Sequence, residues 1–171
     1  DHSRARSASA WIRIIRSECR WVAAGNHDLN AAGRIPSSSN GFSYPENWFS
    51  IKGEERKIIS SGKVWCYEYD AYNDLNESEL EFLRGLPEYL ITTETGVPCL
   101  FSHYIFPDFT GSTTQYIERN NQMKKHWAFM NSNNLYLSFI GHSHNHFPGF
   151  AYSNNSSFFR AFHSMPQDNF Q

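Results

Sequence analysis

The stretch Leu135–Ile140 (LYLSFI), followed by Gly141–His144 (GHSH), decides how this sequence is interpreted. The first six residues alternate and are rich in β-formers, which predicts a buried strand. The glycine after them lets the backbone turn sharply, so His142 and His144 would stand at the carboxyl end of that strand. The pattern therefore predicts two imidazoles at one edge of a sheet.

Two other places in the chain repeat this arrangement. Trp21–Ala24 is expected to be a short strand that delivers Gly25–Asp28 (GNHD), and the strand expected over Val97–Phe101 leads to His103. The carboxyl ends of strands in an open α/β sheet line one crevice, where ligands collect. Imidazole, the Asn carbonyl oxygen and carboxylate are donors that divalent transition metals accept, so a metal site is indicated. A His-x-His pair alone would more often belong to a loop with ordinary hydrogen bonds.

Helices and a hairpin are expected around these motifs. Ser3–Cys19 carries an apolar stripe with helical spacing. Asn76 and Glu79 form a capping box before a helix that ends near Gly85. Tyr89–Thr93 and the run from Val97 are β-rich and separated by a glycine turn, so they predict a hairpin.

The remaining segments are less regular. Residues 29–74 are predicted to be loop-rich with short helices, one opening at Pro45. Their aromatic residues fit either a substrate wall or satellite core packing, and packing is favoured. Thr113–Met130 has a helical apolar spacing that includes Tyr116 and predicts a helix packed on the core. A second hairpin is expected around Ser153–Ser156.

Composition restricts the class of protein. The chain has 171 residues, which fits one domain over residues 1–171, with 40% apolar residues and a net charge of −2. That charge provides no basic field for nucleic acid, and no apolar run is long enough to span a bilayer. Three widely spaced cysteines indicate neither a disulfide framework nor a cysteine zinc site. A reducing, cytoplasmic location is the expectation.

Three motifs together, Gly25–Asp28, His103 after its strand and Gly141–His144, resemble in order the last three motifs of the calcineurin-like metallophosphoesterases. The resemblance covers roughly residues 1–163. It implies an α/β fold in which a β-sandwich is flanked by helices (αββα). It also implies a hydrolase that cleaves phosphomonoesters or phosphodiesters with a metal-activated water, so the expected partner is a phosphate-ester substrate.

The same resemblance assigns the metal ligands. Two divalent ions (Mn, Fe, Zn or Ni) are implied, because His, Asn and carboxylate ligands suit all four metals. Asn26, His103 and His142 would bind the second ion, and His144 would bind the first.

Catalytic roles are also implied for the two residues after Asn26. His27 resembles the family's non-ligand histidine, whose proton stabilises the phosphoryl oxygens or passes to the leaving group. Asp28 would orient that ring and keep it protonated.

The sequence also departs from the family. The opening Asp-x-His and Gly-Asp-x-x-Asp motifs do not occur, so the chain is expected to be an N-terminally incomplete fragment that holds at most one weakly bound ion. The alternative is a non-catalytic scaffold with the same fold that binds proteins, or an inactive fragment. An exposed sheet edge would permit self-association.

Other polar residues lack motif support. Asp108, His126, His146 and His163 are not expected to act directly, and His146 is the nearest of them to a substrate. Asp70 and Asp74 look like turn residues.

Overall fold

The computed structural model describes residues 3–67, 75–94, 96–117, 120–142, 149–154 and 157–162. Several residues singled out in the sequence lie outside this part of the chain: Asp70, Asp74, His144, His146 and His163. The predicted role of His144 as a ligand of the first metal ion therefore stays a prediction.

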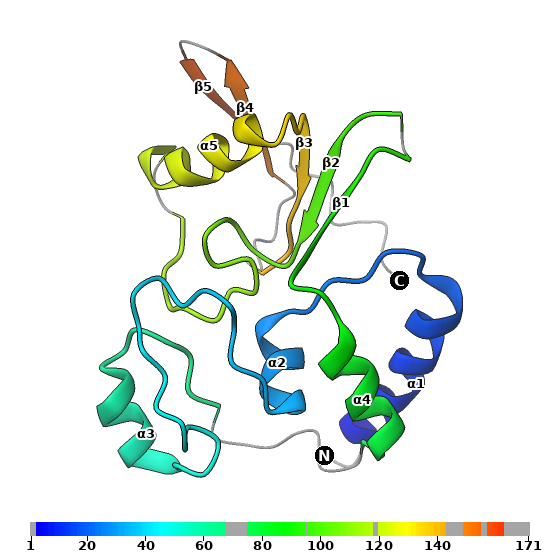
Figure 1. The fold of residues 1–171 in the computed structure, drawn as a ribbon, viewed down its shortest axis with the longest axis vertical. Coiled ribbons are helices and arrows are strands. Elements are labelled where there is room, and N and C mark those ends of the chain that lie inside the picture. The colour runs from blue at the N-terminus through cyan, green and yellow to red at the C-terminus, as the bar shows by residue number, and fades with distance from the viewer. Residues whose placement is uncertain are drawn as a thin grey trace.

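The fold is mixed α/β, as predicted from the alternation of helical and strand patterns. The described helices are α1 (Ser3–Glu18), α2 (Asn26–Ala32), α3 (Gly53–Ser60), α4 (Glu77–Gly85) and α5 (Lys124–Ser132), with a short 3-10 helix at Asn120–Met123. The described strands are β1 (Tyr89–Thr92), β2 (Cys99–Ser102), β3 (Leu137–Phe139), β4 (Gly149–Asn154) and β5 (Ser157–Phe162). Helices α1 to α4 lie at one end of the molecule, and the strands with α5 lie at the other (Figure 1).

The first sheet has the order β1-β2-β3. β1 pairs antiparallel with β2 as a hairpin, which confirms the prediction for residues 89–101. β3 runs parallel to β2, with Phe101 opposite Phe139. Because β2 and β3 are parallel, their carboxyl ends meet at the same edge of the sheet, and His103 and His142 follow at that edge.

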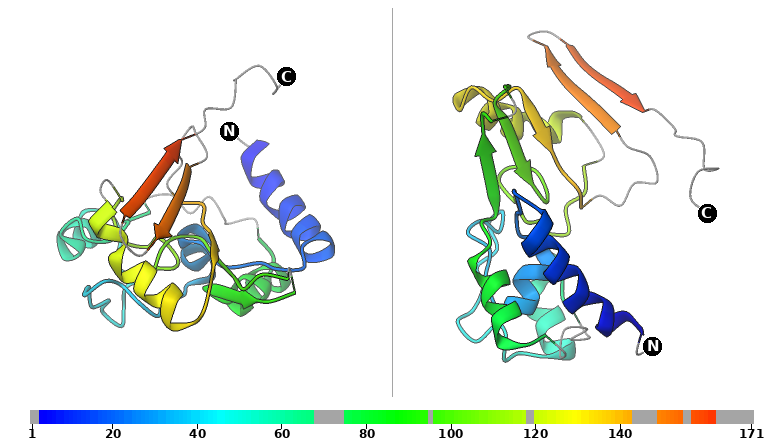
Figure 2. Two further views of the ribbon diagram at one scale, coloured as in Figure 1. Left: turned by 90° about the horizontal axis from the view of Figure 1, so that it is seen from above. Right: turned by 90° about the vertical axis from the view of Figure 1, so that its right-hand side faces the viewer.

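The second sheet is the hairpin of β4 and β5, which lies at the same end of the molecule as the first sheet (Figure 2). The two strands pair antiparallel from Gly149 opposite Phe162 to Asn154 opposite Ser157. This pairing confirms the second predicted hairpin.

Two hydrophobic clusters stabilise the two ends. The first joins α1, α2 and α4 through Ile12, Ala24, Leu29, Ala32, Leu75, Leu83 and Leu86. The second joins the first sheet and α5 through Leu100, Phe109, Met130 and Leu135. Gly25 and Asn26 follow Ala24 of the first cluster, while His103 and His142 follow strands of the first sheet.

Two predicted helices have the expected termini. α1 ends at Glu18, within one residue of the prediction. Asn76 caps α4: its side chain accepts a hydrogen bond from the Glu79 N–H at 3.0 Å, and the Glu79 carboxylate accepts from the Asn76 N–H at 3.0 Å. This reciprocal pair satisfies two donors that the helix backbone leaves open.

The prediction of a strand at Trp21–Ala24 was wrong. This segment is extended but unpaired in any sheet, and Ala24 N–H donates instead to the Pro87 carbonyl at 2.8 Å. β2 already has β1 and β3 on its two sides, so no pairing position beside it remains. The segment therefore packs on the face of the sheet, where the Trp21 ring stacks on Phe101 at 5.6 Å.

The prediction of one helix from Thr113 to Met130 was wrong in its first part. Thr113 forms a β-bridge with Val64, and Trp65 N–H donates to the Ser112 carbonyl at 3.0 Å. These contacts hold the segment extended, and α5 begins only at Lys124. Pro45 likewise opens a series of turns rather than a helix.

The strand predicted over Leu135–Ile140 is shorter and less buried than expected. β3 covers three residues, and the side chains of Leu137 and Phe139 are 45% and 50% exposed. The other face of the sheet is the buried one, because α5 and its cluster cover Leu100 there. None of the helices in the described ranges is long and apolar enough to cross a membrane.

Candidate metal site

His103 and His142 face each other at the edge where β2 and β3 end. His142 Nδ1 lies 3.2 Å from His103 Nε2, and the rings are nearly perpendicular. The Gly141 N–H donates to the His103 carbonyl at 3.0 Å, which continues the β2–β3 pairing past the strand ends. The parallel pairing therefore brings together two residues that are 39 positions apart in the sequence.

Two glycines leave the space that these imidazoles occupy. A Cβ atom on Gly25 would lie 2.9 Å from the His103 ring, and one on Gly111 would lie 2.4 Å from His142 Nδ1. Both distances are below a van der Waals contact, so each glycine is required by the ring beside it. Gly111 also has φ +68°, a conformation that disfavours other residues.

His142 itself adopts a conformation that is uncommon for a residue with a side chain. Its φ is +35°. Such a conformation costs on the order of 1 kcal/mol or more, and it persists where surrounding structure holds it. The rings of Tyr104 and Tyr116 provide that structure, with centroids 4.6 Å and 5.8 Å from the His142 ring.

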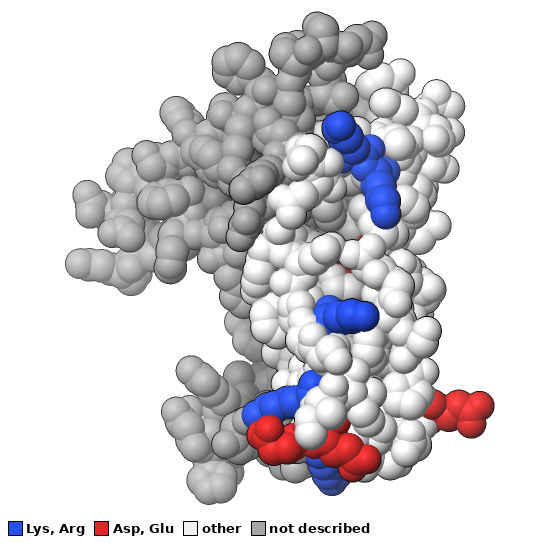
Figure 3. Space-filling view, turned by 90° about the vertical axis from the view of Figure 1, so that its left-hand side faces the viewer, with Lys and Arg blue, Asp and Glu red and all other residues white. Residues whose placement is uncertain are grey.

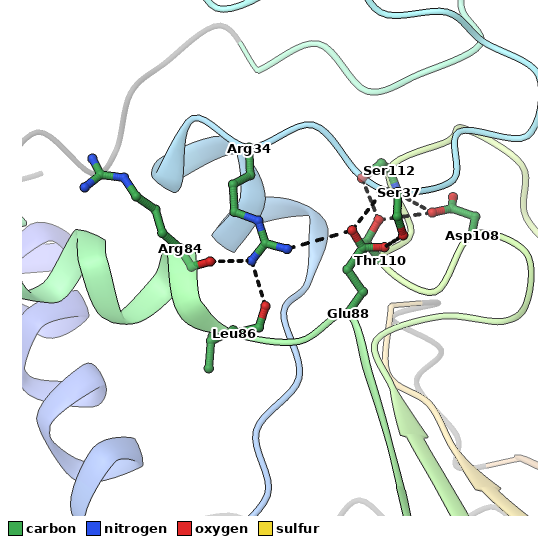
Figure 4. Close-up of polar contacts among 8 residues, drawn as sticks. All are labelled: Arg34, Ser37, Arg84, Leu86, Glu88, Asp108, Thr110 and Ser112. Carbon is green, nitrogen blue, oxygen red and sulfur yellow. Dashed lines mark hydrogen bonds and ion pairs between the residues drawn. The ribbon is translucent and has the colours of Figure 1, made fainter.

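Asp108 organises the loop that presents Gly111. Its carboxylate accepts hydrogen bonds from Thr110 Oγ1 and the Ser112 N–H (Figure 4). It also accepts one from the Thr113 N–H. Asp108 is 4% exposed, so these bonds satisfy a carboxylate that has left water. These bonds fix the loop that carries Gly111.

Tyr104 fixes the following segment. Its hydroxyl donates to the Gln115 carbonyl at 2.9 Å and accepts from the Ile117 N–H at 3.0 Å. Burial raises the pKa of Tyr104 to about 12, so the hydroxyl keeps its proton and both bonds at neutral pH.

Asn26 begins α2 directly after Gly25 and is 6% exposed. Its Nδ2 donates to the Tyr67 hydroxyl at 2.6 Å. No residue in the described ranges donates a hydrogen bond to its buried Oδ1. A buried acceptor without a donor costs about 1–3 kcal/mol. This oxygen is therefore a candidate ligand atom for a bound cation.

His27 and Asp28 occupy different environments. His27 is exposed, and its ring lies 4.8 Å from the Tyr67 ring at a steep angle. Asp28 Oδ2 accepts from the Gly25 N–H at 2.8 Å, which secures the start of α2. Burial raises the pKa of Asp28, and the bond from Gly25 and the nearby His27 partly oppose that rise.

Arg34 ties α2 to the end of α4. Its Nη1 donates to the carbonyls of Arg84 and Leu86 at 2.8 Å and 2.7 Å, and Nη2 lies 3.9 Å from Glu88 (Figure 4). Glu88 in turn accepts from both the backbone N–H and the hydroxyl of Ser37. A cation at the carboxyl end of a helix is favourable, and this contact fixes the helix that carries Asn26.

A cavity of about 220 Å³ shares the side chains of Tyr104 and Tyr116 with the imidazole pair. Its rim includes Lys125 on α5, and Asp108, the acidic residue in its wall, is already hydrogen-bonded. On this side of the molecule basic side chains lie at the level of α5, near the middle and at the opposite end, and most acidic ones lie at that opposite end (Figure 3). The cavity therefore suits a small neutral or anionic group rather than a cation.

His126 is a core residue and takes no part in the site. It is 1% exposed, its Nδ1 accepts from the Phe106 N–H at 3.0 Å, and its Nε2 lies 3.1 Å from Ser138 Oγ. Burial lowers the pKa of His126 to about 4, so the ring is neutral.

The available donors fit a divalent ion. Imidazole nitrogens bind such an ion at about 2.1 Å, so two of them on one ion lie roughly 3.0–3.4 Å apart for bond angles near 90–109°. The 3.2 Å between His142 Nδ1 and His103 Nε2 falls in this range. The same distance also fits a hydrogen bond in which one ring carries the proton. The described residues contain no cluster of three or more His, Cys, Asp or Glu side chains arranged for a metal.

Sequence reasoning missed Tyr67, Gly111 and Tyr116. Gly111 follows Asp108 in an irregular loop, and no motif marks it. Tyr116 fitted a helical stripe and was assigned to core packing, whereas its ring stacks on His142. Tyr67 was one of many aromatic residues in a segment without periodicity.

In comparisons of the chain with protein families, with curated proteins and with solved structures, nothing matched.

Proposed function

We propose that this protein is a metal-dependent phosphoesterase that hydrolyses phosphomonoesters or phosphodiesters with a metal-activated water. The observation that carries the proposal is the placement of His142 Nδ1 3.2 Å from His103 Nε2, in a space that Gly25 and Gly111 keep open. The order of the three sequence motifs supports it. A bound divalent ion would lower the pKa of a water molecule and neutralise charge on the phosphate.

Each side chain then has a distinct task. Asn26, His103 and His142 would hold the ion, and His144 would be a ligand of a second one. His27 follows Asn26 and is exposed, and its proposed task is to give its proton to a phosphoryl oxygen or a leaving group. Asp28 is the proposed partner of His27, because the charge of His27 opposes the rise that burial causes in the pKa of the Asp28 carboxyl.

The proposed architecture is the αββα sandwich. The face of the first sheet that carries Phe101, Leu137 and Phe139 is partly exposed and apolar, and the Phe101 and Phe139 rings stack at 4.9 Å. β4 and β5 form a second sheet at the same end of the molecule. Packing of the second sheet on that apolar face would complete a sandwich, because two sheets bury their apolar faces against each other.

Replacement of His27 tests the division of roles. His27→Ala should leave the Mn²⁺ content of the protein nearly unchanged and reduce hydrolysis by about 10²-fold or more, because a general acid is lost and no ligand is. The measurement is turnover of bis(p-nitrophenyl) phosphate and p-nitrophenyl phosphate, with bound Mn²⁺ determined in parallel.

His103→Ala is the matched comparison, since it should lower both Mn²⁺ content and turnover. Loss of metal from His27→Ala would show that His27 is a ligand rather than an acid. A protein that hydrolyses neither ester with Mn²⁺ bound would refute the esterase proposal and favour the non-catalytic scaffold or the inactive fragment.

A further inference from the structure

We propose that Tyr67 is a positioning residue that fixes the amide of Asn26 with its carbonyl oxygen available to the metal ion. This inference rests on the proposed metal site and adds to it a residue that no motif marks. Tyr67 lies in an irregular segment 41 positions after Asn26, so only the fold brings the two together.

The two ends of the Asn26 amide differ in their chemistry. An Asn side chain presents an acceptor oxygen at one end and an NH₂ donor at the other, and only the oxygen can bind a cation. A rotation by 180° would exchange them and turn two N–H groups toward the ion. The orientation of the Asn26 amide therefore decides whether the residue attracts or repels a metal.

A hydrogen bond to Tyr67 sets the orientation of this amide. Asn26 Nδ2 donates to the Tyr67 hydroxyl at 2.6 Å, which engages the NH₂ end. The Oδ1 end is then left buried, and it receives no hydrogen bond from the residues that the structure describes. Partners of this kind, which hydrogen-bond a metal ligand from behind, typically contribute 10–100-fold to metal affinity.

The hydroxyl and the ring of Tyr67 contact different residues. The Tyr67 ring lies 4.8 Å from the exposed His27 ring, so truncation to alanine would disturb both His27 and Asn26. Tyr67→Phe removes only the hydroxyl and keeps the ring contact. Tyr44 provides a control, because it lines the same cavity of about 20 Å³ beside Asn26 and Tyr67. Its ring packs on Phe42 and Trp48.

The experiment is a double-mutant cycle with Asn26→Asp, in which Mn²⁺ affinity is measured from the electron paramagnetic resonance signal of the free ion. A carboxylate has oxygen at both ends, so its orientation no longer matters for binding a cation. Tyr67→Phe should weaken Mn²⁺ binding by about 10-fold or more when residue 26 is Asn. It should weaken binding by less than about 2-fold in the Asn26→Asp background, and Tyr44→Phe should leave the affinity unchanged.

The outcomes distinguish the two proposals. Equal losses in both backgrounds, or no loss in either, would overturn the positioning role while leaving the metal site in place, because a purely structural hydroxyl would affect both backgrounds alike. Absence of Mn²⁺ binding by the unaltered chain and by Asn26→Asp would overturn the proposed metal site and the role of Tyr67 with it.

Discussion

Gly111→Ala is expected to lower the free energy of unfolding by about 2–5 kcal/mol and to weaken Mn²⁺ binding at least 10-fold. About 1–2 kcal/mol of this comes from placing a side chain at φ +68°. A further 1–3 kcal/mol, roughly, comes from overpacking, since the new Cβ would lie 2.4 Å from His142 Nδ1. His142 cannot move aside without losing its contacts with Tyr104 and Tyr116.

Gly62→Ala is the matched control for this substitution. Gly62 has φ +70°, nearly the same as Gly111, and a Cβ there would meet no atom within 4 Å. Chemical denaturation of both variants therefore separates the backbone cost from the clash with His142. Equal losses of stability, with Mn²⁺ affinity unchanged in both, would contradict the assigned position of His142.

Acidification is expected to destabilise the protein through His126. The pKa of this residue is about 4 in the folded protein, below its usual 6.5, because burial disfavours the charged ring. The unfolded chain therefore binds a proton at a higher pH than the folded protein does. The stability associated with neutral His126 is fully present above pH 6.5 and is lost as the pH falls toward 4, by roughly 3 kcal/mol in total.

His126→Gln tests this prediction. Glutamine does not titrate, and its amide can donate to Ser138 Oγ in place of the imidazole Nε2. The free energy of unfolding, measured by urea titration at several pH values, should fall less steeply between pH 6.5 and 4 in the variant than in the unaltered protein. Other titrating groups contribute equally to the pH dependence of both proteins, so their contribution cancels in the difference between the two curves. Parallel curves would show that the pKa of His126 is not lowered in the folded protein.

Sequence reasoning predicted the parts of the fold that depend on local signals. The capping box at Asn76 and Glu79 and the hairpin of β1 and β2 follow from contacts between residues close in sequence. The contact between His103 and His142 was also expected, because both residues follow strands whose carboxyl ends share one edge.

The rest of the site depends on long-range contacts that leave no periodic signal. Val64 pairs with Thr113 and holds residues 112–114 extended, although their sequence fits the start of a helix. That pairing brings Tyr116 to His142. Trp21–Ala24 has the composition of a strand, but β2 has no free side to pair with it. In each case tertiary packing overrides local propensity.

The central claim is that His103 and His142 bind one divalent ion together. Its most direct test is pulsed electron paramagnetic resonance of Mn²⁺ bound to the 171-residue chain, which detects nitrogen nuclei of coordinated imidazoles. The account predicts one bound ion with coupling to two imidazole nitrogens, reduced to one in His103→Ala. Bound Mn²⁺ without imidazole coupling, or no binding at all, would contradict it and leave the 3.2 Å contact as a hydrogen bond between the rings.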